Sequence, residues 1–267
     1  MKTKIHPTAI VAKEAQIGEG VEIGPYTIVG PKVKIGAGTR IANHAILEGI
    51  TEIGENCEIF SGACFGTAPQ DKKYKNFQSS LVVGNHNIIR EYVTMNPGST
   101  EGSKTIVGDR NFIMIGVHVA HDCILGNDIT IANTVGLSGH VQVEDKAVIG
   151  GMAGVHQFVR IGKLSMTGGA SKVSTDIPPF SICDGNPAKF YGLNSIGLKR
   201  AGYSSKDALE LKKALKILFA SGLKFSTAIQ KVKGEFKKSP DIDHLLEFVA
   251  KTERGISRGK LQINHKI

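Results

Sequence analysis

A six-residue repeat runs through most of the chain and limits the folds that it can adopt. Counting in steps of six from Ile5 to Val173, across two short interruptions, 25 of the 26 repeat positions are apolar. The next residue is glycine at 12 of these positions. A helix needs apolar spacings of three and four, whereas a strand has a side-chain period of two. The repeat therefore predicts a mainly β protein, in which short strands stack coil upon coil as a parallel β-helix.

Two interruptions leave the register intact, because both of their lengths are multiples of six. They span residues 71–82 and 101–106, and we expect them to be loops that leave an otherwise continuous coil. The first is polar and long enough to carry function. The glycine that follows many repeat positions is expected to permit the tight bend between strands.

The charge of the chain divides it into two parts. Residues 1–192 contain 17 basic and 17 acidic residues, whereas residues 193–267 contain 16 basic and 7 acidic ones, which accounts for the whole net charge of +9. From Ser204 the apolar period becomes helical, with helices expected from a Ser205 cap to Gly222, over 226–236 and over 241–253. A loose polar tail is expected from Gly255. We predict a β-helix over 1–192 and a basic helical domain over 193–267 that meets an acidic partner.

Composition excludes several protein classes. With 41% hydrophobic and 21% charged residues, the chain is not intrinsically disordered. It contains no run of 18 apolar residues, so no transmembrane helix is expected, and its first residues lack the apolar core of a secretory signal. The four cysteines form no CxxC pair, which predicts reduced thiols in a cytoplasmic protein. They are Cys57, Cys64, Cys123 and Cys183.

Four of the nine histidines have spacings that would bring them together. If three hexads make one coil, as in known β-helices, positions 18 apart stack. Residue 139, which is 18 after His121, adjoins His140, and residue 157 adjoins His156. His118 lies three residues before His121. None of the four occupies an interior repeat position, so we expect them along one outer edge of the coil.

The histidine edge is compatible with two kinds of chemistry. Neutral imidazoles are common metal ligands, and one imidazole can instead act as a general base while the others hold a substrate. For a base, Asp122 can orient His121, and the backbone N–H of Gly139 is a candidate oxyanion donor. No motif marks a serine or cysteine nucleophile, and Cys123 is expected to be buried. Direct transfer is therefore favoured over a covalent enzyme intermediate, and a purely structural β-helix does not explain the histidine edge.

Several short segments are similar to those of one enzyme family. They are PQD (69–71), HVAHDC (118–123), GHV (139–141), VHQF (155–158), DGNP (184–187) and GLKR (197–200). Together with the hexads, they make residues 5 to about 255 resemble the acyl-acyl-carrier-protein–UDP-N-acetylglucosamine O-acyltransferases, which catalyse the first step of lipid A synthesis. The hexads alone indicate only the wider transferase superfamily, whereas the histidine segments are more specific.

The resemblance implies a left-handed parallel β-helix followed by a small helical domain. It implies a cytoplasmic bacterial homotrimer with active sites between neighbouring β-helices. The reaction would move an R-3-hydroxyacyl group from acyl carrier protein to the 3-hydroxyl of UDP-N-acetylglucosamine. No cofactor or metal would be required, and no nucleic acid or integral membrane segment is implied. The acidic carrier protein would dock on the basic C-terminal domain.

The resemblance also assigns roles to individual residues. His121 would be the general base, Asp122 would orient it, and the Gly139 N–H would hold the oxyanion. Seven residues match family positions that contact the sugar, its nucleotide or the carrier region. They are Asp71, His118, His140, His156, Gln157, Asn194 and Arg200. Residues matching the acyl groove are Gly151 and Gly169. Family-typical residues are replaced at Asn96, Ile196 and Ala201, so whether the acceptor sugar carries a 3-hydroxyl or a 3-amine stays open.

Two other enzyme classes were considered as alternatives. The N-acyltransferase of the same pathway has an additional N-terminal domain, for which hexads that begin at Ile5 leave no room. A γ-type carbonic anhydrase would hold zinc with three histidines at subunit interfaces. A zinc analysis of the purified protein discriminates the latter from an acyltransferase.

Overall fold

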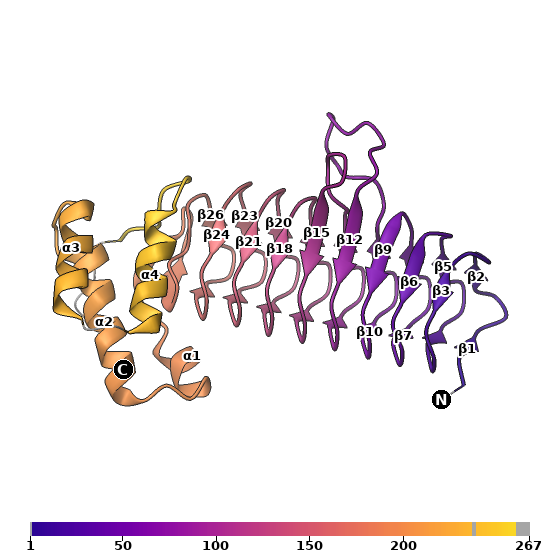
Figure 1. The fold of residues 1–267 in the computed structure, drawn as a ribbon, viewed down its shortest axis with the longest axis horizontal. Helices are drawn as coiled ribbons and strands as arrows, with labels where there is room; N and C mark the ends of the chain where they lie inside the picture. Colours follow the sequence, from indigo (N-terminus) through magenta and orange to yellow (C-terminus); the bar gives the residue numbers. More distant parts are fainter. Residues whose placement is uncertain (1, 237–238, 260–267) are drawn as a thin grey trace.

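The chain winds into a long triangular coil that ends in a group of helices (Figure 1). This computed structural model describes residues 2–236 and 239–259. The strands are short, and neighbouring coils pair in parallel to form three sheets. Among the strands of the described residues, only β28 runs antiparallel to its neighbour. The fold is a left-handed parallel β-helix followed by α-helices, as the sequence and its resemblance predict.

Each sheet contains every third strand of the coil. The first sheet consists of β1 (Lys4–Ile5), β4 (Glu22–Ile23), β7 (Arg40–Ile41), β10 (Glu58–Ile59), β13 (Ile88–Ile89), β16 (Phe112–Ile113), β19 (Thr130–Ile131), β22 (Val148–Ile149), β25 (Met166–Thr167), β27 (Ser181–Asp184) and β28 (Lys189–Leu193). The second consists of β2 (Ile10–Val11), β5 (Ile28–Val29), β8 (Ile46–Leu47), β11 (Cys64–Phe65), β14 (Thr94–Met95), β17 (His118–Val119), β20 (Gly136–Leu137), β23 (Gly154–Val155) and β26 (Lys172–Val173). The third consists of β3 (Gln16–Ile17), β6 (Val33–Ile35), β9 (Ile50–Ile53), β12 (Ser80–Val83), β15 (Lys104–Val107), β18 (Ile124–Leu125), β21 (Gln142–Val143) and β24 (Arg160–Ile161).

The pairing register shows a coil of three hexads. Ile41 pairs with Ile59, 18 residues later. Across the two interruptions Ile59 pairs with Ile89 and Ile89 with Ile113, so the inserted residues leave the stack unchanged. The loops lie further toward the N-terminus than predicted, over 66–79 and 96–103, because β12 and β15 extend to four residues each. Both loops leave the coil at the edge between the second and third sheets, where they project in Figure 1.

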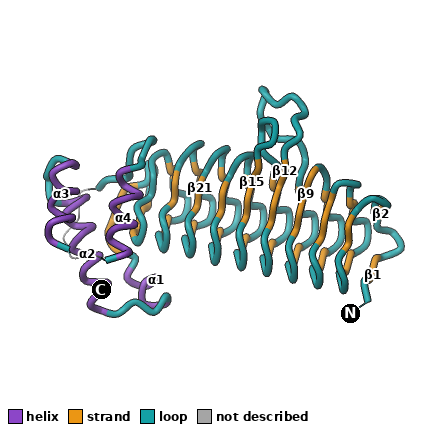
Figure 2. The backbone as a smooth tube through the Cα atoms, viewed as in Figure 1, coloured by secondary structure: helices purple, strands orange, loops and turns teal. Residues whose placement is uncertain are grey.

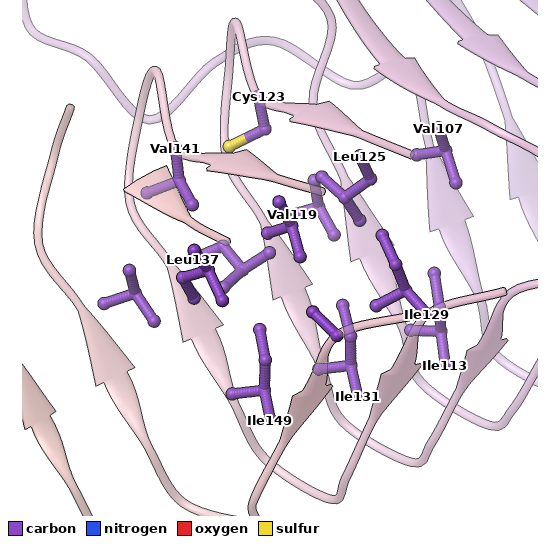
Figure 3. Packing of buried hydrophobic residues seen from close by; sticks show 14 of the residues in the cluster. Val107, Ile113, Val119, Cys123, Leu125, Ile129, Ile131, Leu137, Val141 and Ile149 are labelled. Atoms are coloured by element: carbon purple, nitrogen blue, oxygen red, sulfur yellow. The ribbon is translucent and has the colours of Figure 1, made fainter. Parts of the chain in front are cut away.

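The apolar repeat positions fill the inside of the coil. Every repeat position from Ile23 to Val173 is buried, and Figure 3 shows successive layers of these side chains, including Leu125 and Leu137. Ile5 is exposed because no earlier coil covers the first one. Burial of such side chains stabilises a fold by roughly 1.5–3 kcal/mol each. The ladder is therefore the main source of stability in the coil.

Most glycines after repeat positions do not serve the bends, contrary to prediction, whereas Gly66 does have a left-handed φ of 76°. Gly36 and Gly54 have ordinary negative φ angles, whereas the bends use left-handed residues such as Asp122 and His140, with φ of 59° and 60°. A Cβ on Gly36 would lie 2.5 Å from the backbone carbonyl carbon of Gly54 in the next coil. Glycine is thus needed there because stacked backbones approach too closely for a side chain.

The described residues form four helices after the coil, and Figure 2 shows them at one end of the molecule. They are α1 (Ser195–Arg200), α2 (Ser205–Ala220), α3 (Phe225–Glu235) and α4 (Pro240–Ala250). The first was not predicted. Ser204, not Ser205, caps α2, since its side chain accepts a hydrogen bond from the Asp207 N–H. Pro240 begins α4 as its first residue, where its missing N–H costs no hydrogen bond.

The expected loose tail is held to the coil over its first residues. Ile256 is buried and forms a β-bridge with Asp176, and the Ser257 N–H donates to the Asp176 carbonyl at 2.8 Å. Residues 260–267 lie outside the described part of the chain. Within the described residues, no helix is both long and apolar enough to cross a membrane. The four cysteines are free thiols.

Candidate active site

His121 and Asp122 lie in the turn between β17 and β18, at the edge where the second and third sheets meet. One coil later the equivalent turn carries Gly139 and His140, and the His140 N–H donates to the His121 carbonyl at 3.0 Å. The rings of His121 and His140 have centroids 5.2 Å apart, edge to face. The 18-residue coil therefore brings these two histidines together as their spacing predicts.

The His121 and Asp122 side chains form a buried hydrogen-bonded pair. His121 Nδ1 lies 2.8 Å from Asp122 Oδ2, and His121 is only 7% exposed. Burial by itself raises the pKa of Asp122. Side-chain hydrogen bonds with Ser99, His121 and Ser103 outweigh burial, so the pKa of Asp122 is lowered. The carboxylate thus stays ionised and fixes His121 Nδ1, which leaves Nε2 for chemistry.

Gly139 packs directly against the free edge of the His121 ring. A Cβ at residue 139 would lie 2.4 Å from His121 Cε1 and 2.6 Å from Nε2. Among the described residues, no backbone acceptor is recorded for the Gly139 N–H. The Gly139 backbone therefore lies against the ring edge that contains Nε2, near the place where an oxyanion donor is expected.

Two further imidazoles are held around this pair. His140 Nε2 lies 3.6 Å from Asp122 Oδ2, and its ring stacks on that of Phe158, with centroids 4.5 Å apart. His118 Nδ1 lies 2.7 Å from Thr94 Oγ1. Burial, with a smaller contribution from His121, lowers the pKa of His118. His118 is therefore a neutral hydrogen-bonding group near pH 7.

A groove of about 480 Å³ opens beside His121 on the second sheet. It is lined by Gln70, His118, Ala120, His121, Gly136, Leu137, Ser138, Gly139, Gly154, Val155, His156, Gln157, Lys172, Val173 and Ser174. Added Cβ atoms on Gly136 and Gly154 would meet nothing within 4 Å, so these two strands leave open space. Because these glycines have no side chains, the groove has room for a substrate next to His121.

The predicted loop residue Asp71 does not line this groove. Its carboxylate accepts a hydrogen bond from the Lys73 N–H at 2.9 Å, within its own loop. The preceding residue, Gln70, lines the groove instead. The loop therefore reaches the site, but in the structure of a single chain its acidic side chain serves the loop turn.

The predicted residues near the C-terminal helices have local roles. Asn194 is buried and caps α1, accepting from the Gly197 N–H at 3.0 Å and donating to the Leu164 carbonyl at 2.9 Å. Arg200 is exposed at the end of α1. Neither residue lines the groove beside His121.

The predicted acyl-groove glycines stack at another edge of the coil. Gly151 and Gly169 lie between the first and second sheets, and the Ala170 N–H donates to the Gly151 carbonyl at 2.8 Å. A Cβ on Gly169 would lie 3.3 Å from the Gly151 carbonyl oxygen. They thus lie across the second sheet from His121.

The three departures from the family pattern occupy different environments. Ile196 is 64% exposed on α1, and Ala201 is the C-cap of that helix. Asn96 is buried and donates from Nδ2 to the Thr67 carbonyl at 3.0 Å. Asn96 therefore ties the loop over 96–103 to the loop over 66–79.

Residues that sequence reasoning missed also support the site. Thr105 Oγ1 accepts from the Asp122 N–H at 2.8 Å, and the Ser99 N–H reaches Asp122 from the second loop. Ser99 follows no 18-residue rule because it lies within the second loop. Thr105 does follow it, because it lies 18 residues before Cys123 in the register that pairs Ile106 with Ile124. Phe158 also follows it, 18 residues after His140, and that spacing could have identified it.

The structure also bears on two alternative chemistries. The donor atoms of His121, Asp122 and His140 lie within 4.8 Å of one another, close enough to hold a cation. Asp122 Oδ2 faces both imidazoles and the Ser99 N–H, so its lone pairs already have protein donors. This arrangement fits a hydrogen-bonded triad better than a metal centre. Burial raises the pKa of the Cys123 thiol to about 12, which removes it as a nucleophile.

A family model of the C-terminal region, the relatives and the solved structures all indicate one family. Residues 176–257 match the family described as "Udp N-acetylglucosamine O-acyltransferase; Domain 2", and residues 5–100 match a "GMPPB C-terminal domain". An acyl-[acyl-carrier-protein]–UDP-N-acetylglucosamine O-acyltransferase of Thermodesulfovibrio yellowstonii is 53% identical, over 96% of this chain and 99% of its own length. The chain belongs to this O-acyltransferase family.

Solved structures of O-acyltransferases share the whole fold. LpxA of Acinetobacter baumannii has 42% identity and a TM-score of 0.92, with coverage of 95% of this chain and 99% of the other. LpxA of Bacteroides fragilis has 40% identity and a TM-score of 0.93, covering 95% and 100%. As an O-acyltransferase, the chain is an enzyme whose family acts in lipid A biosynthesis.

Proposed function

We propose that this O-acyltransferase moves an R-3-hydroxyacyl group from acyl carrier protein to the 3-hydroxyl of UDP-N-acetylglucosamine, the first step of lipid A biosynthesis. The relatives' names supply the donor, the acceptor and the oxygen linkage. The observation that carries the mechanism is the buried His121–Asp122 pair, which opens beside Gly139 into the groove.

The chemical step follows from this geometry. His121 Nε2 takes the proton of the sugar 3-hydroxyl as its oxygen attacks the thioester carbonyl, so that a C–O bond forms. The Gly139 N–H donates to the resulting oxyanion, and Asp122 stabilises the imidazolium through Nδ1. The C–S bond then breaks, and the carrier thiolate takes the proton from His121. Proton transfer of this kind contributes roughly 10²–10⁴-fold to rate.

The groove residues are proposed to bind the acceptor. Imidazoles of His118 and His156, with the Gln157 side chain, offer hydrogen-bonding groups in the groove. His140 does not line this groove, but its ring lies edge to face with that of His121. Asp71, Asn194 and Arg200 stay proposals, on the resemblance alone, for contacts to the nucleotide or the carrier region. Gly151 and Gly169 stay proposals for the acyl path across the second sheet.

A homotrimer is part of the proposal. Large apolar side chains are exposed beside the site, at Ile106 (37%), Ile124 (46%) and Phe158 (48%). A neighbouring copy would cover them and complete the groove. We propose that the acidic carrier protein docks on the basic helices, where Lys212 and Lys213 are exposed on α2. A cytoplasmic location is proposed with these partners.

The experiment incubates the protein with UDP-N-acetylglucosamine and a set of 3-hydroxyacyl carrier proteins, with the product detected by mass. A product heavier by one acyl group supports the reaction, and its absence with every thioester overturns it. The His121→Ala variant should lose roughly 10²–10⁴-fold in kcat. Turnover close to wild type by folded His121→Ala would exclude the general-base role. Stoichiometric zinc whose removal abolishes activity would favour the metal alternative.

A further inference from the structure

Arg254, in the segment that follows α4, contacts one of the groove histidines. Its Nη2 lies 2.9 Å from His156 Nδ1. The two residues are 98 positions apart, and neither the hexads nor the quoted family segments connect them. A cationic group thus lies against an imidazole of the substrate groove.

This contact fixes which ring nitrogen of His156 carries the proton. A guanidinium has only donors and stays charged, so the nitrogen that faces it must accept. Nδ1 of His156 is therefore unprotonated, and the proton lies on Nε2. The Gln157 carbonyl oxygen lies 3.4 Å from the same Nδ1. Because a carbonyl only accepts, a hydrogen bond with it would require the proton on Nδ1. The shorter, charge-assisted contact with Arg254 prevails.

A buried carboxylate anchors the segment that carries Arg254. Asp176 is fully buried, and its carboxylate accepts from the Thr252 hydroxyl and from the Arg160 N–H, both at 2.9 Å. Its backbone N–H donates to the Gly255 carbonyl at 2.9 Å, and its carbonyl accepts from the Ser257 N–H at 2.8 Å. Residues on both sides of Arg254 are thereby fixed to the last coil.

Arg160 adds a second attachment from the coil to the end of α4. Its guanidinium donates to the Lys251 carbonyl at 2.9 Å and to the Phe248 carbonyl at 3.1 Å. It also lies over the Phe248 ring, 3.9 Å from the centroid. Because the helix end is held this closely, the position of Arg254 is set by the fold and not by the reach of a free arginine side chain.

We propose that Arg254 is a positioning residue for the nucleotide sugar. It holds His156 with Nε2–H as a donor, and its remaining N–H groups, on an exposed side chain, add positive charge at the groove. Both features suit the anionic diphosphate and carbonyl oxygens of the acceptor. This inference rests on the proposed function for the identity of the ligand, whereas the Arg254–His156 contact stands without it.

The test is a double-mutant cycle on KM for UDP-N-acetylglucosamine. A hydrogen bond to a charged group contributes about 1.5–3 kcal/mol, so Arg254→Gln should raise this KM at least roughly tenfold. If Arg254 acts through His156, Arg254→Gln should raise this KM by a much smaller factor when His156 is already replaced by alanine. KM for the acyl carrier protein and the melting temperature should stay near those of wild type. If the double variant raises KM by the product of the two single-variant factors, the residues act independently and the proposal is overturned.

Two variants control this cycle. Arg254→Lys keeps the charge without the planar fork and should give an intermediate KM. If it matches wild type, the guanidinium geometry is unnecessary and the positioning role is overturned. Arg110→Gln removes an exposed arginine paired with Asp128 on another part of the coil, and its effect should be additive with His156→Ala.

A measurement without substrate separates this proposal from the proposed function. The ¹⁵N NMR signals of the His156 ring should show an unprotonated Nδ1 in wild type. In Arg254→Gln the Gln157 carbonyl becomes the remaining partner, so Nδ1 should gain protonated character. Identical ring shifts in the two proteins overturn the proposal. A wild-type protein that makes no product overturns the proposed function but leaves this measurement interpretable.

Discussion

The most exacting test of the site is a single added methyl group at Gly139. In Gly139→Ala the new Cβ would lie 2.4 Å from His121 Cε1, whereas ordinary van der Waals contact begins at 3.4 Å. The ring must therefore move by about 1 Å. It has no free direction, because it is 7% exposed, bound to Asp122 through Nδ1 and in edge contact with His140.

A displacement of about 1 Å of a reacting group costs about 10²-fold in rate. That loss equals about 2.7 kcal/mol of transition-state stabilisation. We expect it in kcat, measured by mass detection of the acylated sugar nucleotide at saturating substrates. KM for the acceptor should change less than kcat, because the other two groove glycines, Gly136 and Gly154, still leave open space.

A matched substitution isolates the effect of the contact. Gly234→Ala places a methyl group on α3, where nothing lies within 4 Å, and should leave kcat at the wild-type value. Alanine in a helix should stabilise the protein slightly, by up to about 1 kcal/mol. Folded Gly139→Ala with wild-type kcat would refute the claim that the placement of His121 against Gly139 matters for turnover.

Two further predictions concern the helical region. Charge reversal at Lys212 and Lys213 should raise KM for the acyl carrier protein, and the effect should fade as salt is added, since exposed charges are screened; an unchanged KM at low salt would leave these lysines without a docking role. The second concerns His244 on α4, which lies 2.8 Å from Glu144 on the coil. This hydrogen bond and the charge of Glu144 raise the pKa of His244 against burial and Lys163. Protonated His244 therefore stabilises the fold fully below about pH 6.5, and that contribution is lost as the pH rises through the raised pKa. The melting temperature of His244→Gln should fall below wild type at acidic pH, and the difference should shrink as the pH rises; a deficit that does not depend on pH would contradict this.

Periodicity explains why so much could be predicted from the residues alone. In a parallel coil, a fixed sequence separation becomes a fixed position in space, so one repeat predicts the core, the three sheets and the insertions that leave them intact. The same rule placed His140 one coil above His121, and their rings are in contact. Local rules were less accurate: the cap of α2 is Ser204, and the coil glycines serve close stacking of backbones.

Groups outside the repeat could not be placed in this way. The N–H of the loop residue Ser99 donates to Asp122, and the Asn194 side chain caps α1. Arg254, in the segment after α4, contacts His156. Each contact joins segments whose separation follows no period. These contacts depend on how the loops fold and how the helices pack on the coil, and both depend on the whole set of packing contacts.

The β-helix and the stacking of His140 on His121 thus follow from the residues alone, because a repeat of six residues and a coil of three hexads fix both. The chemistry of that edge depends instead on contacts that form in the folded protein. The tertiary structure lowers the pKa of Asp122 through side-chain hydrogen bonds with Ser99 and His121, places Gly139 against the free edge of His121, and attaches the C-terminal segment to Asp176. Those features depend on contacts of about 3 Å between segments remote in sequence, and a pattern of residue types does not encode such contacts.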